Sequence, residues 1–270
     1  MSDKADADSK SREEGGFGET VKVVIQALLI ALVIRTVLFQ PFNIPSGSLI
    51  PTLLIGDYLF VSKYSYGYSR YSLPQLPDSL AWMMPRSVEL PKGRIIDSAP
   101  KRGDVAVFKL PRDGSTDYIK RVIGLPGDRI QMVEGRLVIN GQVVPRVEVE
   151  KYTTSDAYGR KVPVATYNET LPGGVTHRII EIEGDRGFND NTPVITVPEG
   201  HYFMMGDNRD NSTDSRVPAE RDGVGPVPFD NFVGRAEVIF FSFDSDVASF
   251  FEVWKWPMAI RWGRLFQPVR

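Results

Sequence analysis

The sequence contains 270 residues, of which 42% are hydrophobic and 24% charged, as is typical of a globular protein. Because the 32 basic and 34 acidic residues nearly balance, composition predicts no basic surface, and no nucleic-acid partner is expected. Cysteine is absent and the only histidines are His177 and His201, which excludes disulfides, thiolate chemistry and a multi-histidine metal site. We expect no metal or cofactor.

The N-terminal part of the chain changes abruptly from polar to apolar. Residues 1–20 are polar and acid-rich, which predicts a disordered tail. Residues 21–42 are mostly apolar, and about 20 helical residues span the roughly 30 Å core of a bilayer. A buried amphipathic helix of a soluble protein is the alternative. No small-x-small cleavage site follows, so the run is interpreted as an uncleaved transmembrane anchor rather than a removed signal peptide.

Basic residues predict how this anchor is oriented. Lys4, Lys10, Arg12 and Lys22 precede the span, whereas the next basic residue after Arg35 is Lys63. Because Lys and Arg are retained on the cytoplasmic side, we expect a cytoplasmic N-terminus and an exported body.

Short alternating segments follow the anchor and predict a mainly antiparallel β body, which also fits the high content of 24 Gly and 20 Pro. The asparagine–glycine pair at 140–141 is a strong hairpin signal. Residues 69–100 are proline-rich and predict a long surface excursion. The expected strands are Tyr58–Ser65, Val105–Leu110, Tyr118–Ile123, Arg129–Val133, Arg136–Ile139, Gln142–Val147, Arg178–Ile182, Tyr202–Met205 and Phe232–Phe241.

The C-terminal residues 246–270 combine aromatic and basic side chains. Trp254, Trp256 and Trp262 alternate with several arginines. This composition is typical of a segment at a membrane interface, although an ordinary terminal segment packed on the β body is the alternative.

Three blocks could carry chemistry. In residues 41–53, Pro45 and Pro51 stiffen the chain around Ser46-Gly47-Ser48, a turn that could present a serine hydroxyl. A proline-rich linker leaving the membrane is the simpler alternative.

In the second block, residues 117–128, strand alternation places Lys120 on the same face as Tyr118 and Val122. Such apolar neighbours could desolvate the amine and lower its pKa, so that it could act as general base for a serine. Most strand lysines are instead simply at the surface.

The third block, residues 206–216, alternates carboxylate, amide, hydroxyl and guanidinium groups, which suits either a solvated loop or a hydrogen-bonded scaffold. The run beginning at Asp210 lacks the features of an EF-hand loop, because Ser215 and Arg221 stand where Gly and Glu are needed.

Taken in order, these blocks and the run at 102–108 resemble bacterial type I signal peptidases, in which they also follow an N-terminal anchor. The resemblance implies a mainly β fold: a transmembrane helix, then an antiparallel β-sheet catalytic domain with a β-rich insertion, of the signal-peptidase/SOS-repressor protease type. The implied domains are a cytoplasmic tail (1–20), an anchor (21–42), a catalytic core in two parts (43–128 and 201–245), an insertion (129–200) and a membrane-proximal C-terminal segment (246–270).

The resemblance also implies roles for individual residues. Ser48 corresponds to the nucleophile and Lys120 to the general base, while the Ser46 hydroxyl and the Ser48 N–H form the oxyanion hole. Ser212 corresponds to a serine that hydrogen-bonds the lysine, and Asp214 and Arg216 to a supporting ion pair. The residues that correspond to walls of pockets for small side chains are Phe42, Ile44, Leu53, Tyr118 and Ile119.

Two departures from the family pattern stand out. Leu49 follows the nucleophile where the family often has Met, a change that conserves volume. Residues 217–224 intervene before a Gly-Pro-Val-Pro run that the family commonly reaches within three residues of the arginine.

The resulting hypothesis is a serine endopeptidase of the bacterial inner membrane, with its catalytic domain on the extracytoplasmic side, that cleaves signal peptides from exported preproteins after small-x-small motifs. The expected partners are these preproteins and the lipid bilayer. The alternatives are a catalytically silent membrane-tethered scaffold and a self-cleaving Ser/Lys repressor-type protease.

Overall fold

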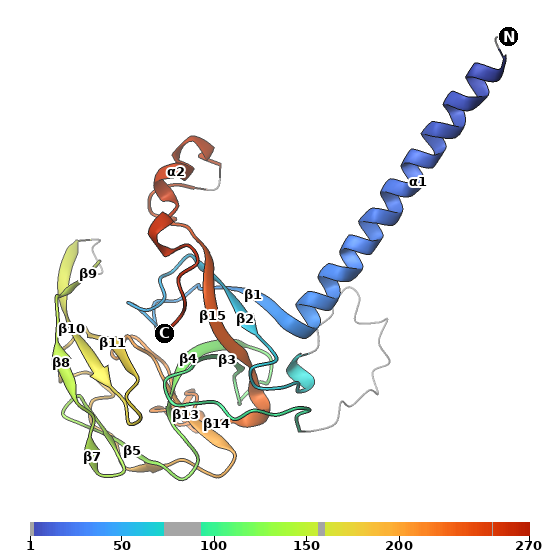
Figure 1. Cartoon of the computed structure of the whole chain (residues 1–270). Helices are drawn as coiled ribbons and strands as arrows, with labels where there is room; N and C mark the ends of the chain where they lie inside the picture. Colours follow the sequence, from blue (N-terminus) through green and yellow to red (C-terminus); the bar gives the residue numbers. More distant parts are fainter. Residues whose placement is uncertain (1–2, 73–92, 156–159, 250) are drawn as a thin grey trace.

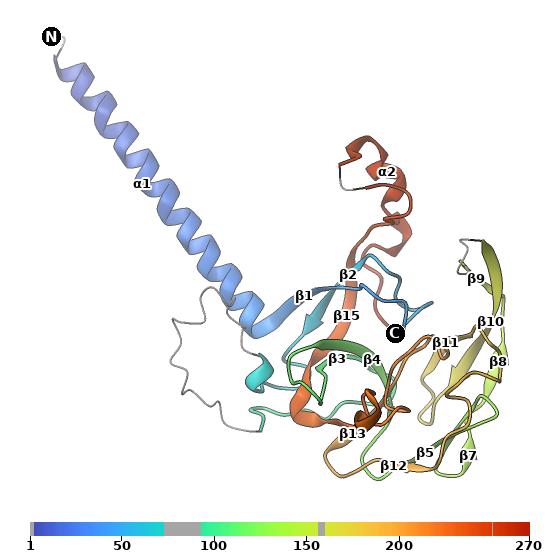
Figure 2. The ribbon, with the colours of Figure 1, turned by 180° about the vertical axis from the view of Figure 1, so that it is seen from behind.

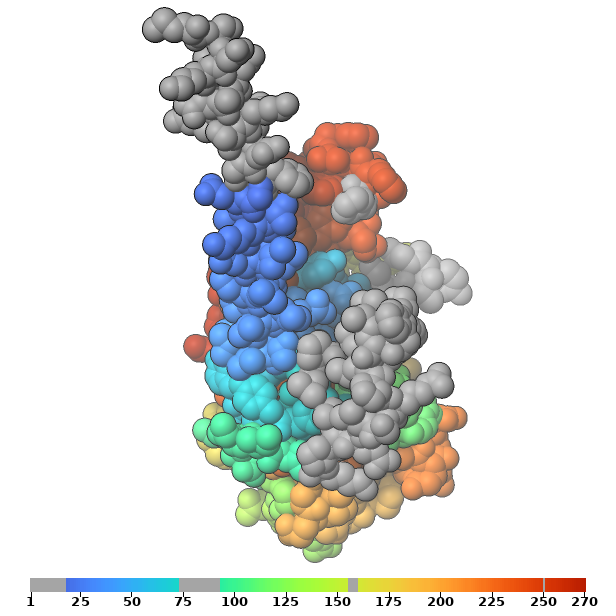
Figure 3. All heavy atoms as spheres, turned by 90° about the vertical axis from the view of Figure 1, so that its right-hand side faces the viewer, coloured from blue at the N-terminus to red at the C-terminus, as the bar shows by residue number. Residues whose placement is uncertain are grey.

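A long N-terminal helix projects from a β body in the computed structural model, which describes residues 3–72, 93–155, 160–249 and 251–270. Helix α1 spans Asp3–Val33 and continues as a π-helical turn, Ile34–Leu38. Figures 1 and 2 show α1 standing clear of the sheets. Within it, Gly18–Leu38 is long and apolar enough to cross a membrane, and none of it is buried against the body; in Figure 3 these residues form a separate column.

Both predicted boundaries of the anchor differ from the structure. Residues 3–20, for which the sequence predicted disorder, are helical, and Ala, Lys, Glu and Arg in this stretch are good helix formers. The helix ends at Leu38, and Phe39–Asn43 forms strand β1 instead of the last turn of the anchor. Pro41, which has no N–H, is tolerated because β1 is an edge strand of its sheet.

A seven-stranded antiparallel sheet contains or borders the sequence blocks for which the resemblance implies catalytic roles. Its strand order is β1-β2-β15-β3-β4-β13-β14, so the middle of the chain leaves after β4 and returns at β13. The strands are β1 Phe39–Asn43, β2 Asp57–Ser62, β3 Val105–Lys109, β4 Asp117–Gly124, β13 His201–Met205, β14 Val227–Pro228 and β15 Phe232–Ser242.

Two four-stranded sheets form between β4 and β13, on the side of the molecule away from α1 (Figure 1). One sheet has the order β12-β5-β6-β7, and in the other β10 pairs with β11, β8 and β9. This topology separates residues 129–196 from the larger sheet, while the finer domain boundaries remain a prediction. The strands are β5 Arg129–Val133, β6 Arg136–Ile139, β7 Gln142–Val143, β8 Arg146–Glu148, β9 Tyr152–Ser155, β10 Lys161–Thr170, β11 Thr176–Glu181 and β12 Ile195–Thr196.

The mainly β architecture is confirmed, with local differences. The hairpin at Asn140 and Gly141 is confirmed, since both residues have positive φ and join β6 to β7. The predicted strand Gln142–Val147 is split at Pro145, which has no N–H to donate. Strand β10, at the centre of its sheet, was missed because Pro163 and its many polar residues hide the alternation.

Buried side chains of the large sheet form a core directly beneath the proposed nucleophile. Leu49 and Leu53 pack there with Val61 and Val107. Of the predicted surface excursion at 69–100, residues 73–92 lie outside the described residues.

The C-terminal segment rises from the same end of the body as α1 (Figures 1 and 2). It includes the short helix α2, Trp256–Ala259. Arg264 anchors the segment through hydrogen bonds to the buried carboxylate of Asp57, the shorter being 2.5 Å. Its large apolar side chains nevertheless stay exposed: Phe251, Trp254, Met258, Trp262 and Phe266.

Candidate active site

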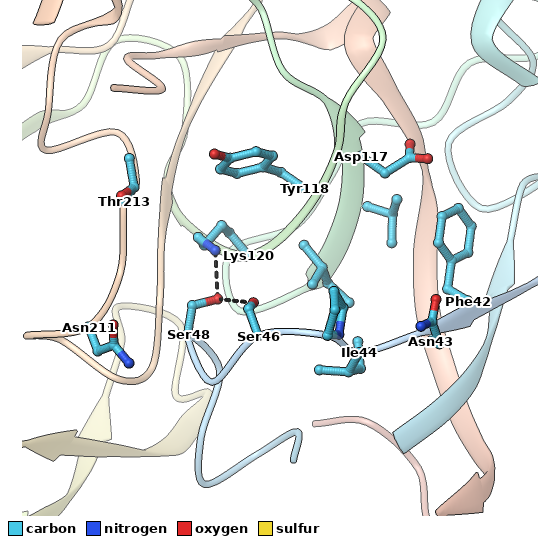
Figure 4. Close-up of a pocket in the computed structure, with 13 residues that line it drawn as sticks. Phe42, Asn43, Ile44, Ser46, Ser48, Asp117, Tyr118, Lys120, Asn211 and Thr213 are labelled. Atoms are coloured by element: carbon cyan, nitrogen blue, oxygen red, sulfur yellow. Dashed lines mark hydrogen bonds between the residues drawn. The ribbon is translucent and has the colours of Figure 1, made fainter. Parts of the chain in front are cut away.

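The serine turn that follows β1 brings two hydroxyl groups to Lys120 in the middle of strand β4. Lys120 Nζ lies 2.7 Å from Ser48 Oγ and donates a hydrogen bond to it, and Ser46 Oγ lies 3.5 Å from the same oxygen (Figure 4). Ser48 is buried, whereas Ser46 is exposed. A substrate carbonyl could therefore approach the pair from the Ser46 side.

The backbone of this turn is held by the loop at 206–216. Asn208 donates its backbone N–H to the Ser48 carbonyl at 3.0 Å and its side-chain amide to the Gly47 carbonyl at 3.1 Å. Gly206 also packs tightly here, because a Cβ at this position would lie 2.5 Å from the Ser48 carbonyl oxygen. The serine is thus positioned by a segment about 160 residues away in the chain.

The amine of Lys120 is buried on β4, between β3 and β13, with only 4% of the residue exposed. Burial lowers the pKa of Lys120 from 10.5 to about 8, against the opposing charges of Asp214 and Asp207. Its Nζ also lies 5.3 Å from the centre of the Tyr118 ring, as expected for neighbours on one strand face. The neutral amine is accessible near pH 8, so this lysine can accept a proton.

The serine–lysine pair lies on the wall of an open groove of about 500 Å³ (Figure 4). Sequence reasoning missed Asn43, Val107, Asp117, Asn211 and Thr213 on its walls. Leu53 does not line the groove, because it is fully buried in the core beneath the serine turn. The predicted site residues on the groove are Phe42, Ile44, Ser46, Ser48, Tyr118, Ile119 and Lys120.

The predicted ion pair within the 206–216 loop is present in the structure. Arg216 donates two hydrogen bonds of 2.9 Å to Asp214, and both side chains are buried. Asp214 also accepts the Gly206 N–H, and Arg216 donates to the Arg209 carbonyl at 2.6 Å. These bonds close the loop on itself, and the negative charge of Asp214 faces Lys120 closely enough to affect its pKa.

Ser212 differs from its predicted role. Its buried Oγ forms no hydrogen bond with the Lys120 amine among the described residues, and it lies instead near Asp214, whose pKa it helps to lower. The hydroxyl also packs against Gly206, where a Cβ would approach it to 2.3 Å.

A buried charge network behind the site was not predicted. Arg121 forms a bidentate ion pair with Asp207, and Arg209 forms another with Glu169 on β10. His177 lies between the pairs, 3.5 Å from Glu169, and burial lowers its pKa to about 4, so it stays neutral near pH 7. Arg121 lies in the sequence block 117–128, and Asp207 and Arg209 lie in the block 206–216. No sequence pattern indicated a role for Glu169 or His177.

A buried lysine amine that donates to a serine hydroxyl in an open groove is the arrangement that a Ser–Lys hydrolase would use. A family model described as signal peptidase, peptidase S26, matches residues 17–241. Signal peptidase I of Rickettsia conorii is 42% identical over 253 residues, covering 89% of this chain and 88% of that protein. Signal peptidase I of Rickettsia canadensis is 40% identical over 274 residues, covering 96% of each.

The chain therefore belongs to the peptidase S26 family of signal peptidases, which confirms the resemblance and the predicted enzyme class. A crystal structure of a signal peptidase I from Enterococcus faecalis V583 is 27% identical and covers 51% of this chain and 97% of that chain, with a TM-score of 0.29.

Proposed function

We propose that this membrane-anchored signal peptidase cleaves exported preproteins with Ser48 as nucleophile and Lys120 as general base. The observation that carries the assignment is the 2.7 Å contact between Lys120 Nζ and Ser48 Oγ inside an open groove. No other histidine, lysine or carboxylate is recorded as a hydrogen-bond partner of the Ser48 hydroxyl among the described residues.

The reaction proceeds through an acyl-enzyme. Neutral Lys120 takes the hydroxyl proton as Ser48 Oγ attacks the scissile carbonyl, and the resulting ammonium returns a proton to the leaving amine. A water molecule then replaces the leaving group. Lys120 accepts a proton from that water as it attacks the ester carbon, and then gives the proton to Ser48 Oγ as the ester bond breaks, which regenerates the hydroxyl and the neutral amine.

Two donors would stabilise the oxyanion that forms during each step. The Ser46 hydroxyl lies 3.5 Å from Ser48 Oγ, on the exposed side of the turn, so it can reach an oxygen attached to the attacked carbon. The Ser48 backbone N–H supplies the second donor. Loss of one such donor typically lowers kcat about 10²–10³-fold.

The groove walls favour substrates with small side chains beside the cleaved bond. Phe42, Ile44, Tyr118 and Ile119 line the groove that holds the serine–lysine pair. Such bulky walls would favour small substrate side chains, as in the small-x-small pattern that precedes the cut in exported preproteins.

The placement of the membrane segments supports cleavage at the extracytoplasmic face of the bacterial inner membrane. Helix α1 and the C-terminal aromatic segment leave the body at the same end (Figures 1 and 2). The basic residues before the span favour a cytoplasmic N-terminus. Trp254 and Trp262, both exposed, would lie at headgroup level and keep the body against the bilayer.

The proposal is tested by incubating a purified preprotein that carries an A-x-A signal with the wild-type enzyme and with Lys120→Met, in detergent with EDTA. We expect cleavage at the signal junction by the wild type and a loss of at least about 10³-fold in the variant, because removal of a triad or dyad member leaves little catalysis.

A matched control is Lys63→Met. Lys63 is also buried and burial also lowers its pKa to about 8, but its Nζ donates to the Ser72 carbonyl and no serine hydroxyl is bound to it. Cleavage should survive in this variant. Equal cleavage by the wild type and Lys120→Met would remove Lys120 from the mechanism, and failure of the wild type on several preproteins would favour a silent scaffold.

A further inference from the structure

Three carboxylates converge at a place that the peptidase chemistry does not use. Glu181 ends strand β11, Asp190 lies in the following loop, and Asp210 belongs to the 206–216 loop. One oxygen from each group lies within 4.8 Å of the others. Glu181 is 1% exposed and Asp190 is 0% exposed, while Asp210 is half-buried.

One oxygen of each carboxylate accepts a hydrogen bond from the protein. Within the described part of the chain, the other oxygen accepts none. Among the described residues, Glu181 Oε2 and Asp190 Oδ1 are buried and have no hydrogen-bond partner. Leaving buried acceptors unpaired is costly, and more so when they are charged. The occupied oxygens are Glu181 Oε1 with Arg146 at 3.3 Å, Asp190 Oδ2 with the Gly187 N–H at 2.6 Å, and Asp210 Oδ2 with the Glu183 N–H at 2.7 Å.

Among the described residues, the guanidinium groups of Arg146, Arg209 and Arg216 form no hydrogen bond with the unpaired oxygens of Glu181 and Asp190, although the charge of Arg216 acts on Asp190. Arg146 divides its donors among Glu181 Oε1, Asp185 and a backbone carbonyl, and Arg209 is paired with Glu169. In the part of the chain that the structure describes, no donor therefore bonds to the buried Glu181 Oε2 or Asp190 Oδ1, and a bound cation would satisfy both oxygens.

Gly187 allows the Asp210 carboxylate to approach this cluster. A Cβ at position 187 would lie 2.1 Å from Asp210 Oδ1 and 3.2 Å from Asp190 Oδ2. Any side chain would displace the Asp210 carboxylate. The glycine thus leaves room for the Asp210 carboxylate beside Asp190.

We propose that Glu181, Asp190 and Asp210 bind a calcium ion. All three ligands are oxygen atoms, which suits a hard cation rather than zinc or copper. Ca²⁺ takes six to eight oxygens at about 2.3–2.6 Å in flexible geometry, so two Ca–O bonds span the observed separations, whereas Mg²⁺ demands near-ideal octahedral ligands at about 2.0–2.1 Å. Water completes the coordination on the half-exposed side of Asp210.

The ion would clamp the insertion to the loop that supports the catalytic pair. Glu181 and Asp190 lie between the two halves of the large sheet in sequence, whereas Asp210 follows directly on Arg209. The Arg209 carbonyl in turn accepts Arg216, the partner of Asp214. The expected role is structural, so the inference stands independently of the proposed peptidase mechanism.

The test is calcium-dependent stability of the full-length protein in detergent after removal of metals with EDTA and exchange of the buffer. Thermal unfolding is followed over about 0.1–10 mM Ca²⁺, a range that brackets the affinities of about 10⁻⁴–10⁻³ M typical of extracellular calcium modules. We expect Tm to rise by several degrees with Ca²⁺ and much less with Mg²⁺, since a ligand that binds only the folded state stabilises it. Terbium luminescence reports direct binding at the same site.

Isosteric variants locate the ion. Glu181→Gln and Asp190→Asn each remove one charge, and we expect at least a tenfold loss of calcium affinity. Glu183→Gln is the matched control, because Glu183 is exposed and contributes only its backbone N–H to the cluster. This variant should keep the wild-type calcium response.

A wild-type Tm that does not change with Ca²⁺ would overturn the proposal, as would equal responses of Glu181→Gln and Glu183→Gln. If Glu181→Gln is more stable than a wild type that ignores calcium, the carboxylates share a proton instead. Should both isosteric variants fail to fold, terbium binding to the wild type, with or without competing Ca²⁺, decides the matter. None of these measurements uses a peptide substrate, so failure here and failure of the peptidase assignment are separate results.

Discussion

Two buried lysines, Lys120 and Lys63, can be compared to show what a lysine needs in order to act as a general base for a serine. Burial lowers the pKa of both Lys120 and Lys63 to about 8. Lys63 donates to a backbone carbonyl, which has no proton to give, whereas Lys120 contacts the hydroxyl of Ser48. A lowered pKa makes the neutral amine available, but only the contact with a hydroxyl group makes it a base for nucleophilic attack.

The pH dependence of cleavage follows from the lowered pKa of Lys120. Because the base must be neutral, kcat/KM should rise about tenfold per pH unit below about 8 and level off above it. Initial rates on a peptide substrate between about pH 6 and pH 10 check this. A rate that is already constant above about pH 6 would contradict a lysine base and indicate a group with an ordinary histidine pKa.

The same lysine should reduce the stability of the fold. Its pKa is lower in the folded state than the value of 10.5 expected when unfolded, so below about pH 8 the buried ammonium carries its full penalty. Lys120→Met should therefore raise the free energy of unfolding at pH 7 by about 1–3 kcal/mol. The gain should fade as pH rises from about 8 to about 10.5, where the folded protein no longer carries the charge.

Denaturant unfolding of Lys120→Met and wild type at about pH 7 and about pH 10 measures this gain. Ser48→Ala serves as control, because it abolishes the nucleophile but leaves the amine buried, and it should show no comparable gain. A destabilised Lys120→Met at pH 7 would mean that the lost contacts of the lysine outweigh its desolvation.

At the scale of elements, the loop at 206–216 supports the site by close backbone packing and not by a bond to the lysine. Gly206 follows β13 directly and lies against both Ser212 and the Ser48 carbonyl. The ion pair between Asp214 and Arg216 holds the loop in this position. The geometry of the serine turn therefore depends on the absence of a side chain at position 206.

Gly206→Ala should accordingly displace the nucleophile. Its Cβ would meet Ser212 Oγ at 2.3 Å and the Ser48 carbonyl oxygen at 2.5 Å, and a shift of about 1 Å at a reacting atom can cost about 10²-fold in rate. We expect kcat to fall by about that factor. Gly263→Ala is the control, since no atom lies within 4 Å of a Cβ there. Unchanged kcat in Gly206→Ala would show that the turn relaxes freely.

At the scale of the whole molecule, the anchor and the aromatic C-terminal segment leave the body at one end, which we propose faces the membrane. Both extend in the same direction from the body, and the two small sheets lie at the opposite side (Figures 1 and 2). The groove lies on the large sheet. The edge strand β1 of this sheet begins directly where the anchor helix ends. A substrate held in the bilayer by its own apolar segment would reach the groove without leaving the membrane.

The absence of cysteine from the chain allows the orientation to be mapped with single cysteines. Ser115→Cys lies in the exposed turn between β3 and β4, and Ser9→Cys lies before the span. In cells with a permeabilised outer membrane, an impermeant maleimide should label only Ser115→Cys, and Ser9→Cys should react after lysis. The opposite pattern would contradict a cytoplasmic N-terminus.

The sequence alone determined the features that depend on neighbouring residues. The apolar run predicted a membrane helix, alternation and turn residues predicted a β body, and short motifs predicted Ser48 and Lys120 as the reacting pair. The predictions that were wrong also concerned local structure. Residues 3–20 are helical instead of disordered, because they contain good helix formers, and strand β10 was missed because Pro163 interrupts its alternation.

Only the tertiary structure decided how distant groups meet. Ser48 and Lys120 are 72 residues apart, Arg121 and Asp207 are 86 apart, and Glu169 and Arg209 are 40 apart. It also left Ser212 without a hydrogen bond to the lysine among the described residues and brought the three carboxylates together. Burial, hydrogen bonding and pKa depend on what the folded chain places within a few ångströms of each group, and no local pattern of residues specifies that distance.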